Sequence, residues 1–233
     1  MTLVGILQTG HTPDELKDKC GDYDVFFKNL LKEQGFTFKT WAPIDMEFPN
    51  SANDADCWIV TGSRHGVYED CPWITPLAAF IREIAKSEKR LLGICFGHQI
   101  IAHALGGKVE KYEGGWAIGP REYQLNNGQK LMLNAWHQDQ VITPPKTAKV
   151  IGSNDFCQNA ILTYGNEILS YQPHPEFDHE FMEDLFSARG NVLPEDTKIQ
   201  VRLCLNEKTE TNLIANQIGQ FLKGDIAPDA IIY

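Results

Sequence analysis

Short apolar runs recur along the first half of the chain, separated by longer stretches that mix apolar and polar residues. Four of these runs have the length of buried strands: 3–7, 36–41, 57–61 and 91–94. Such runs are typical of strands that are covered on both faces. We therefore expect them to lie side by side inside a sheet that is packed between layers of helices.

The stretches between the runs show helical periodicity. Between 72 and 88, apolar residues follow the i, i+3, i+4, i+7 spacing of one helix face, at Ile74, Leu77, Ala78, Ile81, Ile84 and Ala85. Further helices are expected at 23–34 and at 96–105, the second of which ends at the Gly106-Gly107 pair. Strands that alternate with helices predict a largely parallel sheet.

The pattern changes between 107 and 172. Short β-like runs occur at 130–135, 149–152, 160–164 and 168–171, with turn signals such as Asn127-Gly128 between them. They predict an antiparallel extension of the sheet. After 176 the pattern is helical again, and the last helix carries Ile214, Ile218, Phe221 and Leu222 on one side. We expect a single three-layer α/β domain over 1–233, with a core at 1–177 and a helical C-terminal extension at 178–233.

Charge and cysteine content narrow the range of partners and compartments. The formal net charge of −10 disfavours binding to nucleic acid and to anionic membranes. The first ten residues, MTLVGILQTG, predict a buried strand and neither a signal peptide nor a membrane span. The six cysteines include no CxxC pair, so a structural zinc site is not expected. These features predict a reduced, soluble, cytoplasmic protein.

The segment GICFGHQ places a cysteine between two glycines, where a predicted strand turns into a predicted helix. Gly93-Ile94-Cys95-Phe96-Gly97 has the G-x-nucleophile-x-G form of a nucleophile elbow. Such a turn exposes its central side chain at the carboxyl end of the sheet, and a helix N-terminus favours the reactive thiolate. A cysteine packed as a small apolar residue is the alternative, and the spacing alone leaves both open.

A base for such a nucleophile is available in the segment YQPHPE at 171–176. The two prolines favour extended backbone, and in an extended segment residues i and i+2 point the same way. Glu176 would then accept a hydrogen bond from His174 and fix its tautomer. Taken in isolation, the segment favours the alternative, a proline-rich turn whose His and Glu are solvated.

Together and in this order, the two motifs resemble the class I (triad-type) glutamine amidotransferases. The resemblance rests on LLGICFGHQIIAHALGG at 91–107, YQPHPEF at 171–177 and WIVTGS at 58–63, and it covers most of 1–177. It implies that Cys95 is the nucleophile, His174 the base and Glu176 the acid that orients this base. We accordingly expect a three-layer, flavodoxin-like fold.

The resemblance also implies the rest of the site. Gly62 and Phe96 would mark the two sources of oxyanion-hole N–H groups. The substrate-binding positions would be Ser63, Gln99, Trp136 and His137, the last two in a WHQD segment that is similar to the family's W-x-H-x-D region but is spaced as W-H-x-D. The loop TGSRHG at 61–66 departs from the family's usual TGG form. Arg64 would add a cation near the mouth of the site, or Arg64 and His65 are simply exposed polar residues of the loop.

The functional expectation is a stand-alone enzyme. The sequence has no P-loop and no dinucleotide fingerprint. Tyr68-Glu69-Asp70 and Pro72-Trp73-Ile74 resemble a stand-alone subgroup that is similar to the amidotransferase part of GMP synthase and includes cytosolic γ-glutamyl peptidases. The expected reaction is thioester-mediated hydrolysis of a γ-glutamyl amide in glutamine or a small γ-glutamyl conjugate. A glutaminase that passes ammonia to a separate synthetase is one alternative, and a non-catalytic regulatory relative is another.

No metal or organic cofactor is expected from the sequence. His98 and His103 are five residues apart, so they lie on different sides of a helix and cannot share an ion. His11 and His179 have no partner at ligand spacing, and we expect both at the surface or behind the site. Cys157 and Cys204 are expected to be packing residues.

Overall fold

A nine-stranded mixed sheet runs through the centre of the computed structural model, which describes residues 1–230. Its order is β2-β1-β3-β4-β11-β10-β9-β6-β7. The first five strands in this order pair in parallel: β2 (Thr37–Trp41), β1 (Leu3–Leu7), β3 (Cys57–Val60), β4 (Leu91–Ile94) and β11 (Ile168–Tyr171). The other four are antiparallel to their neighbours: β10 (Ile161–Tyr164), β9 (Ala148–Ser153), β6 (Ala117–Leu125) and β7 (Lys130–His137). The predicted parallel sheet with an antiparallel extension is confirmed.

Two strands stand outside this sheet. β5 (Lys108–Lys111) and β8 (Asp139–Thr143) form a separate antiparallel pair. The sequence did not predict these two strands, and it also missed β6. The four strands predicted in the first half and the four predicted between 107 and 172 are all present within one or two residues of the expected bounds.

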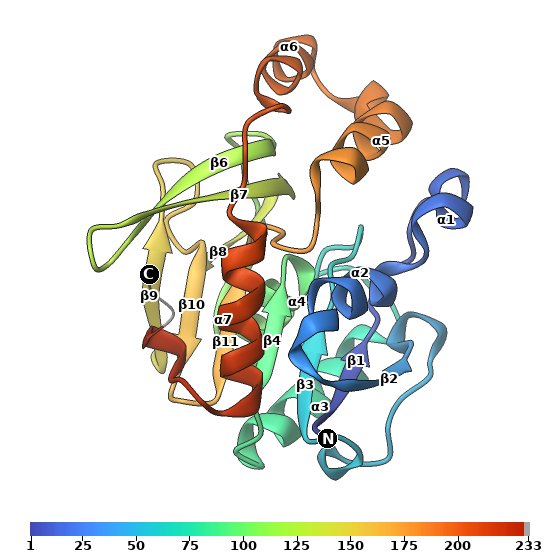
Figure 1. The fold of residues 1–233 in the computed structure, drawn as a ribbon, viewed down its shortest axis with the longest axis vertical. Coiled ribbons are helices and arrows are strands. Elements are labelled where there is room, and N and C mark those ends of the chain that lie inside the picture. Colours follow the sequence, from blue (N-terminus) through green and yellow to red (C-terminus); the bar gives the residue numbers. More distant parts are fainter. Residues whose placement is uncertain (231–233) are drawn as a thin grey trace.

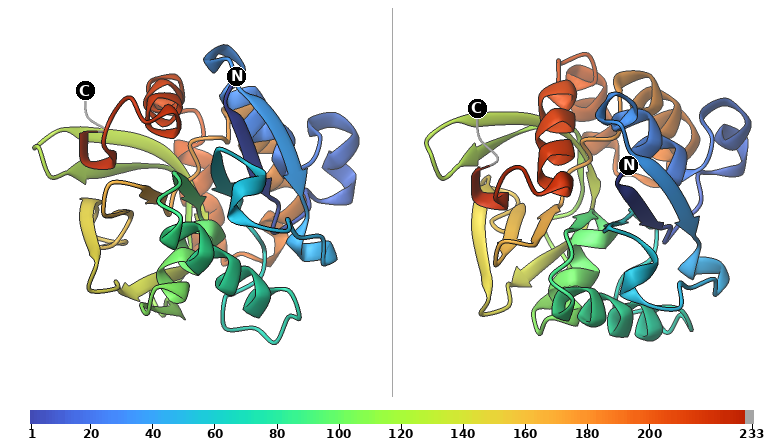
Figure 2. Two further views of the ribbon diagram at one scale, coloured as in Figure 1. Left: turned by 90° about the horizontal axis from the view of Figure 1, so that it is seen from below. Right: turned by 60° about the horizontal axis from the view of Figure 1, so that its bottom comes forward.

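Helices cover both faces of the sheet, as predicted. On one face, α3 (Ile74–Lys86) and α4 (Phe96–Ala104) pack their apolar sides against a cluster that includes Trp58 and Val60 of β3. On the other face, α2 (Tyr23–Leu30) and α7 (Thr211–Lys223) pack against a cluster that includes Cys57 and Ile59. Alternate residues of one strand thus enter opposite layers, and Figures 1 and 2 show the helices on the two sides.

The remaining helices differ from the expectation in detail. The helix predicted at 23–34 ends earlier as α2 and is followed by a 3₁₀ turn, and α1 (Asp14–Cys20) was not predicted. The structure contains five 3₁₀ turns in the described chain: η1 (Lys32–Gln34), η2 (Pro43–Asp45), η3 (Ala52–Asp54), η4 (Gly190–Val192) and η5 (Pro228–Ala230).

The C-terminal region is helical, as the sequence predicted. α5 (His179–Arg189) and α6 (Glu195–Cys204) lie together beyond one end of the sheet, whereas α7 returns across its face (Figure 1). α5 and α6 enclose a third apolar cluster that includes Phe177, Phe181 and Val201. The last three residues of the predicted extension, 231–233, lie outside the described residues. Across 1–230, no helix is both long and apolar enough to cross a membrane.

Candidate active site

Cys95 occupies a sharp turn between β4 and α4. Its backbone has φ 52° and ψ −103°, a conformation that is strained for any residue with a side chain. Strain of this kind costs about 1–3 kcal/mol and persists only where the surroundings enforce it. At Gly97, a Cβ atom would lie 2.2 Å from the carbonyl oxygen of Val60, so only glycine fits this close approach of α4 to β3. The structure therefore contains the turn that the glycine spacing predicted.

Backbone hydrogen bonds hold this turn between two neighbouring strands. The N–H of Cys95 donates to the carbonyl of Tyr171 at the end of β11, with a distance of 2.8 Å. The N–H of Gly97 donates to the carbonyl of Thr61, just after β3, at 3.1 Å. The parallel strands β3, β4 and β11 thus end around Cys95, at the edge where open α/β sheets bind ligands. The Cys95 side chain lies 4.0 Å from the carbonyl oxygen of Trp136.

His174 and Glu176 form a buried pair directly after β11. The Nδ1 of His174 lies 2.7 Å from Oε1 of Glu176, and the two side chains are only 5% and 2% exposed. The ring of Phe177 stacks on the His174 ring at 4.0 Å, with an angle of 4° between the planes. The i, i+2 arrangement expected for an extended segment is therefore present. The alternative of a solvated turn is wrong, because both polar side chains are buried.

His174 also interacts with Cys95, so the three residues form a connected group. Burial alone would lower the pKa of His174, but the Glu176 carboxylate, together with the charge of Cys95 and a hydrogen bond to it, raises this pKa well above its usual value. Because Nδ1 of His174 is hydrogen-bonded to Glu176, Nε2 is the ring nitrogen that is available to interact with Cys95. In proteins generally, a protonated histidine beside a cysteine favours the reactive thiolate form.

Gly62 lies against both members of the Cys95–His174 contact. A Cβ atom at this position would be 3.1 Å from Cε1 of His174 and 3.7 Å from Cβ of Cys95. Hydroxyl groups of Thr9 and Thr61 both donate to the Gly62 carbonyl, at 3.0 and 3.1 Å. Since the N–H of a trans peptide points opposite to its C=O, these two bonds fix the direction of the N–H of Ser63.

Phe96 supplies a second backbone N–H next to Cys95. It is the first residue of α4, and N–H groups in the first helical turn have no acceptor within the helix. The neighbouring N–H of Gly97 is already bonded to Thr61. The Phe96 amide and the loop at Gly62 therefore both lie next to Cys95.

The predicted pocket residues divide into two groups. Gln99 and His137 are buried and bonded inside the protein: the amide of Gln99 donates to the carbonyl of Asp139 at 3.0 Å, and Nδ1 of His137 lies 3.3 Å from the same oxygen. Burial lowers the pKa of His137 to about 3, so this ring is neutral. Trp136 packs against the apolar cluster that includes Phe177, and the hydroxyl of Ser63 accepts the N–H of His65 at 3.2 Å.

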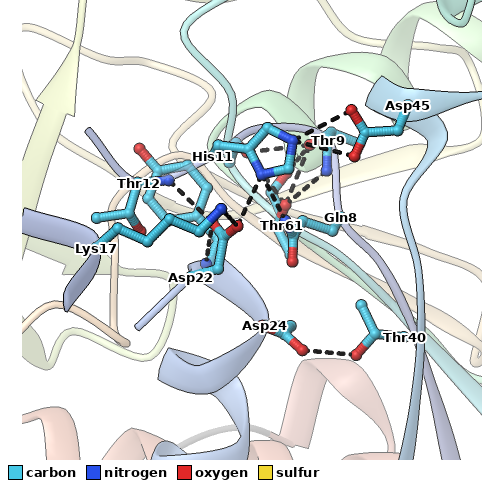
Figure 3. A network of polar contacts seen from close by, with 12 residues as sticks. Gln8, Thr9, His11, Thr12, Lys17, Asp22, Asp24, Thr40, Asp45 and Thr61 are labelled. Atoms are coloured by element: carbon cyan, nitrogen blue, oxygen red, sulfur yellow. Dashed lines mark hydrogen bonds and ion pairs between the residues drawn. The ribbon is translucent and has the colours of Figure 1, made fainter. Parts of the chain in front are cut away.

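The other histidines lie at the surface or behind the site, as expected, and several have partners that the sequence did not indicate. His11 is exposed and lies 2.7 Å from Asp22 and 3.1 Å from Asp45, two carboxylates on opposite edges of its ring (Figure 3). His65 is half-buried and lies 2.7 Å from Glu69, whereas Arg64 is exposed. His98 is fully buried and pairs with Ser170 at 2.8 Å. These partners are distant in sequence or lie in loops, where spacing carries no signal.

Two residues that support the site were missed by sequence reasoning. Thr9 lies beside Thr61 and holds the Gly62 carbonyl (Figure 3). Asn134 accepts the N–H of His174 through its own carbonyl at 2.7 Å, and its side chain donates to the carbonyl of Phe177 at 2.9 Å. Neither belongs to a recognisable motif, and each acts across 40 or more residues of sequence.

Comparisons with known proteins identify the family of this chain. Residues 24–188 match the family described as glutamine amidotransferase class-I. γ-Glutamyl peptidase 2 of Arabidopsis thaliana is 30% identical over 190 residues, which cover 75% of this chain and 76% of that protein. One subunit of the glutamine-hydrolysing GMP synthase of Saccharolobus solfataricus is 33% identical over 138 residues, which cover 53% of this chain and 69% of that protein.

The fold has a counterpart among solved structures. The crystal structure of a glutamine amidotransferase from Methylobacillus flagellatus has a TM-score of 0.74 at 18% identity, covering 96% of this chain and 93% of that one. This likeness shows a common fold. Since the family match spans most of the chain, the protein belongs to the class I glutamine amidotransferases.

Proposed function

We propose that this protein hydrolyses γ-glutamyl amide bonds, with Cys95 as the nucleophile, His174 as the base and Glu176 as the acid that orients it. The observation that carries the proposal is a contact: Cys95, a strained residue in the turn of a nucleophile elbow, interacts with His174 of the buried His174–Glu176 pair. A cysteine, a base on one ring nitrogen and an orienting carboxylate on the other are what nucleophilic catalysis requires.

The reaction proceeds in two half-reactions. The Cys95 thiolate attacks the side-chain carbonyl carbon of the γ-glutamyl group and forms a C–S bond. The tetrahedral oxyanion accepts hydrogen bonds from the N–H of Phe96 and from the loop at Gly62, each worth roughly 3–4 kcal/mol in comparable enzymes. His174 then gives a proton to the departing amine as the C–N bond breaks, which leaves a γ-glutamyl thioester on Cys95.

Water completes the cycle. His174, now neutral, takes a proton from a water molecule, whose oxygen attacks the thioester carbonyl. The C–S bond breaks, the thiolate is restored beside the imidazolium, and free glutamate or a γ-carboxylate is released. The Glu176 carboxylate keeps the Nδ1 proton in place throughout, so that Nε2 exchanges the reacting proton. No external oxidant, reductant or cofactor is needed for this balance.

We further propose that Ser63 and Trp136 line the substrate pocket. Trp136 presents its carbonyl 4.0 Å from the Cys95 sulfur, and Ser63 follows the glycine that touches His174. Gln99 and His137 would lie behind the residues that touch the substrate, because their polar groups already bond to the Asp139 carbonyl. In this arrangement they shape the wall of the pocket.

Similarity to γ-glutamyl peptidase 2 over three quarters of the chain favours a small γ-glutamyl peptide or conjugate as substrate. Similarity to the GMP synthase protein over half of the chain favours the second candidate, a glutaminase that supplies ammonia to a separate synthetase. The two differ in the leaving group, an amine-bearing peptide in one case and ammonia in the other.

A side-by-side assay tests these proposals. Amine or ammonia release is measured from glutamine, γ-glutamyl dipeptides and glutathione conjugates, for the wild type, Cys95→Ala and Cys20→Ala. We expect turnover of the peptides by the wild type and by Cys20→Ala, a variant of a partly exposed cysteine outside the site. Cys95→Ala should be folded and inactive. Turnover of glutamine alone would favour the glutaminase, and no turnover of any substrate would favour a non-catalytic relative.

A further inference from the structure

Three metal-ligating side chains of different chemistry converge in the loop that follows β3. His65 Nδ1 lies 2.7 Å from Glu69 Oε2, and Cys71 Sγ lies 3.7 Å from that nitrogen and 3.8 Å from that oxygen. Within residues 1–230, no other group of three His, Cys, Asp or Glu side chains brings its ligand atoms so close together.

The arrangement differs from that of a catalytic triad. In the Cys95 site the carboxylate of Glu176 is hydrogen-bonded to Nδ1 of His174, so the other ring nitrogen, Nε2, is available to the Cys95 sulfur. At His65 the carboxylate and the sulfur both approach the same nitrogen, Nδ1. Three ligand atoms that lie within 4.8 Å of one another suit coordination of a single ion. They do not suit relay of a proton across the ring.

The separations are close to those of a tetrahedral zinc site. Zn–N, Zn–S and Zn–O bonds of about 2.0–2.3 Å place nitrogen and sulfur, or sulfur and oxygen, about 3.6 Å apart, and nitrogen and oxygen about 3.4 Å apart. Both sulfur separations in the structure, 3.7 and 3.8 Å, already fit. The N–O separation of 2.7 Å is that of a hydrogen bond, and it reaches the required value if the 41%-exposed Glu69 side chain moves by less than about 1 Å.

Neighbouring groups hold the ligands in this orientation. The second oxygen of Glu69 accepts the N–H of Gly66 at 2.7 Å, and the backbone N–H of His65 donates to the Ser63 hydroxyl. The His65 ring also packs edge-on against the buried Trp73, with 5.9 Å between the ring centroids. Outer contacts of this kind orient the ligands in metal sites.

We propose that His65, Glu69 and Cys71 bind a divalent transition-metal cation of the zinc type, with a fourth position open to water or to an external ligand. Nitrogen, sulfur and carboxylate donors together favour zinc-like ions over Mg²⁺ and Ca²⁺, which prefer oxygen alone. On binding, the proton of the Cys71 thiol passes to solvent, and the neutral imidazole of His65 carries its proton on Nε2 while Nδ1 coordinates the cation.

The proposed cation site is separate from Cys95 but connected to it. The loop that contains the three ligands begins at Gly62, beside His174. The ring of Trp73 contacts that of Phe96 as well as that of His65, with centroid distances of 5.2 and 5.9 Å. A bound cation would therefore stiffen the loop that flanks the catalytic turn.

Cobalt is the probe for the experiment, because a tetrahedral Co²⁺–thiolate complex has a near-ultraviolet charge-transfer band and strong visible bands. The full chain is titrated with Co²⁺ under reducing conditions, and Zn²⁺ is then added as a competitor. We expect one equivalent of Co²⁺ to give both sets of bands and Zn²⁺ to abolish them. Cys71→Ser should lose the thiolate band, and His65→Ala and Glu69→Gln should bind at least about tenfold more weakly.

Two variants serve as matched controls. Cys20→Ser removes another partly exposed thiol and should leave the spectrum unchanged. Cys95→Ala should also keep the bands, which separates this proposal from the proposed hydrolase activity. Circular dichroism checks that each variant is folded. A wild type without a thiolate band, or a band that is lost in Cys95→Ala and retained in Cys71→Ser, would overturn the assignment.

Discussion

Asn134 holds the segment that contains His174 from two sides. Its carbonyl accepts the N–H of His174 at 2.7 Å, and its side-chain amide donates to the carbonyl of Phe177 at 2.9 Å. Asn134 is 3% exposed, so these bonds are shielded from water. Since Phe177 stacks on the His174 ring, one asparagine of β7 fixes both the backbone and the stacking partner of the proposed base.

The first prediction follows from this relationship. Asn134→Ala leaves the buried carbonyl of Phe177 without its donor, which costs about 1–3 kcal/mol of unfolding free energy. We expect a lower urea midpoint and reduced kcat, measured by denaturation and by turnover of a γ-glutamyl dipeptide. Asn53→Ala, at an exposed asparagine, is the control and should change neither quantity. Unchanged stability in Asn134→Ala would show that the hydrogen bond from the Asn134 side chain to Phe177 is dispensable.

A second prediction concerns Gly62. In Gly62→Ala the new methyl carbon would lie 3.1 Å from Cε1 of His174, which displaces the ring from Cys95. Displacements of about 1 Å in a catalytic group reduce rates by about 100-fold, so we expect kcat/KM to fall by that order. The melting temperature should change little. Arg64→Ala, in the same loop but exposed, tests whether any substitution there has this effect. A fully active Gly62→Ala would contradict the proposed geometry.

The third prediction concerns the pH dependence of Cys95 reactivity. Burial opposes protonation of His174, and the Glu176 charge restores it, so Glu176→Gln should lower the pKa of His174. The imidazolium beside Cys95 would then lose its proton at a lower pH, and its support for a reactive thiolate would weaken. We expect alkylation of Cys95 near neutral pH to slow by about tenfold for each unit of lost pKa. The rate is measured against pH by mass spectrometry, with Glu180→Gln on the exposed face of α5 as control. Superimposable profiles for all three proteins would refute the role of Glu176.

A fourth prediction concerns acid stability through Asp22. Burial raises the pKa of Asp22, but hydrogen bonds from His11, Lys17 and the N–H of Thr12 outweigh it and lower this pKa to about 2. A carboxyl whose folded-state pKa is depressed contributes stability above its unfolded value of about 3.9, and this contribution is lost as the pH falls toward 2. Asp22 also caps α2 by accepting the N–H of Tyr23.

Asp22→Asn should therefore be less stable than the wild type at pH 7, by about 1 kcal/mol or more, and the difference should narrow toward pH 2. For His11 the pH dependence has the opposite sign. Burial would lower the pKa of His11, but the Asp22 and Asp45 carboxylates raise it. Its contribution is present below about pH 6.5 and disappears as the pH rises through the folded-state value. Urea midpoints across the pH range measure both effects, with Asp18→Asn as an exposed control. A constant difference between wild type and Asp22→Asn would contradict this account.

The strands around the site could be predicted because they are short, apolar and bounded by turn signals. β6 could not, since its Gly119-Pro120 pair is typical of a turn. In the structure β9 pairs only with the end of β6, at Gln124 and Leu125. Pro120 therefore lies where β6 has a single strand partner, a position in which a missing N–H is tolerated.

The Cys95 and His174 motifs were visible in sequence because each depends on residues within five positions of one another. The contacts that support them were not. Thr9 reaches Gly62 across 53 residues, and Asn134 reaches Phe177 across 43, so only the packed sheet brings them together. The two carboxylates beside His11 could not be predicted for the same reason, since they are 11 and 34 residues away in the sequence.

The most direct test of the central claim is to trap the acyl-enzyme. Wild-type protein is mixed with a γ-glutamyl dipeptide, quenched in acid within the first turnover, digested and examined by mass spectrometry. We predict a γ-glutamyl adduct on the peptide that contains Cys95, absent in Cys95→Ala and released by hydroxylamine as a thioester should be. Turnover of the dipeptide with the adduct on another cysteine, or undiminished turnover by Cys95→Ala, would contradict the account.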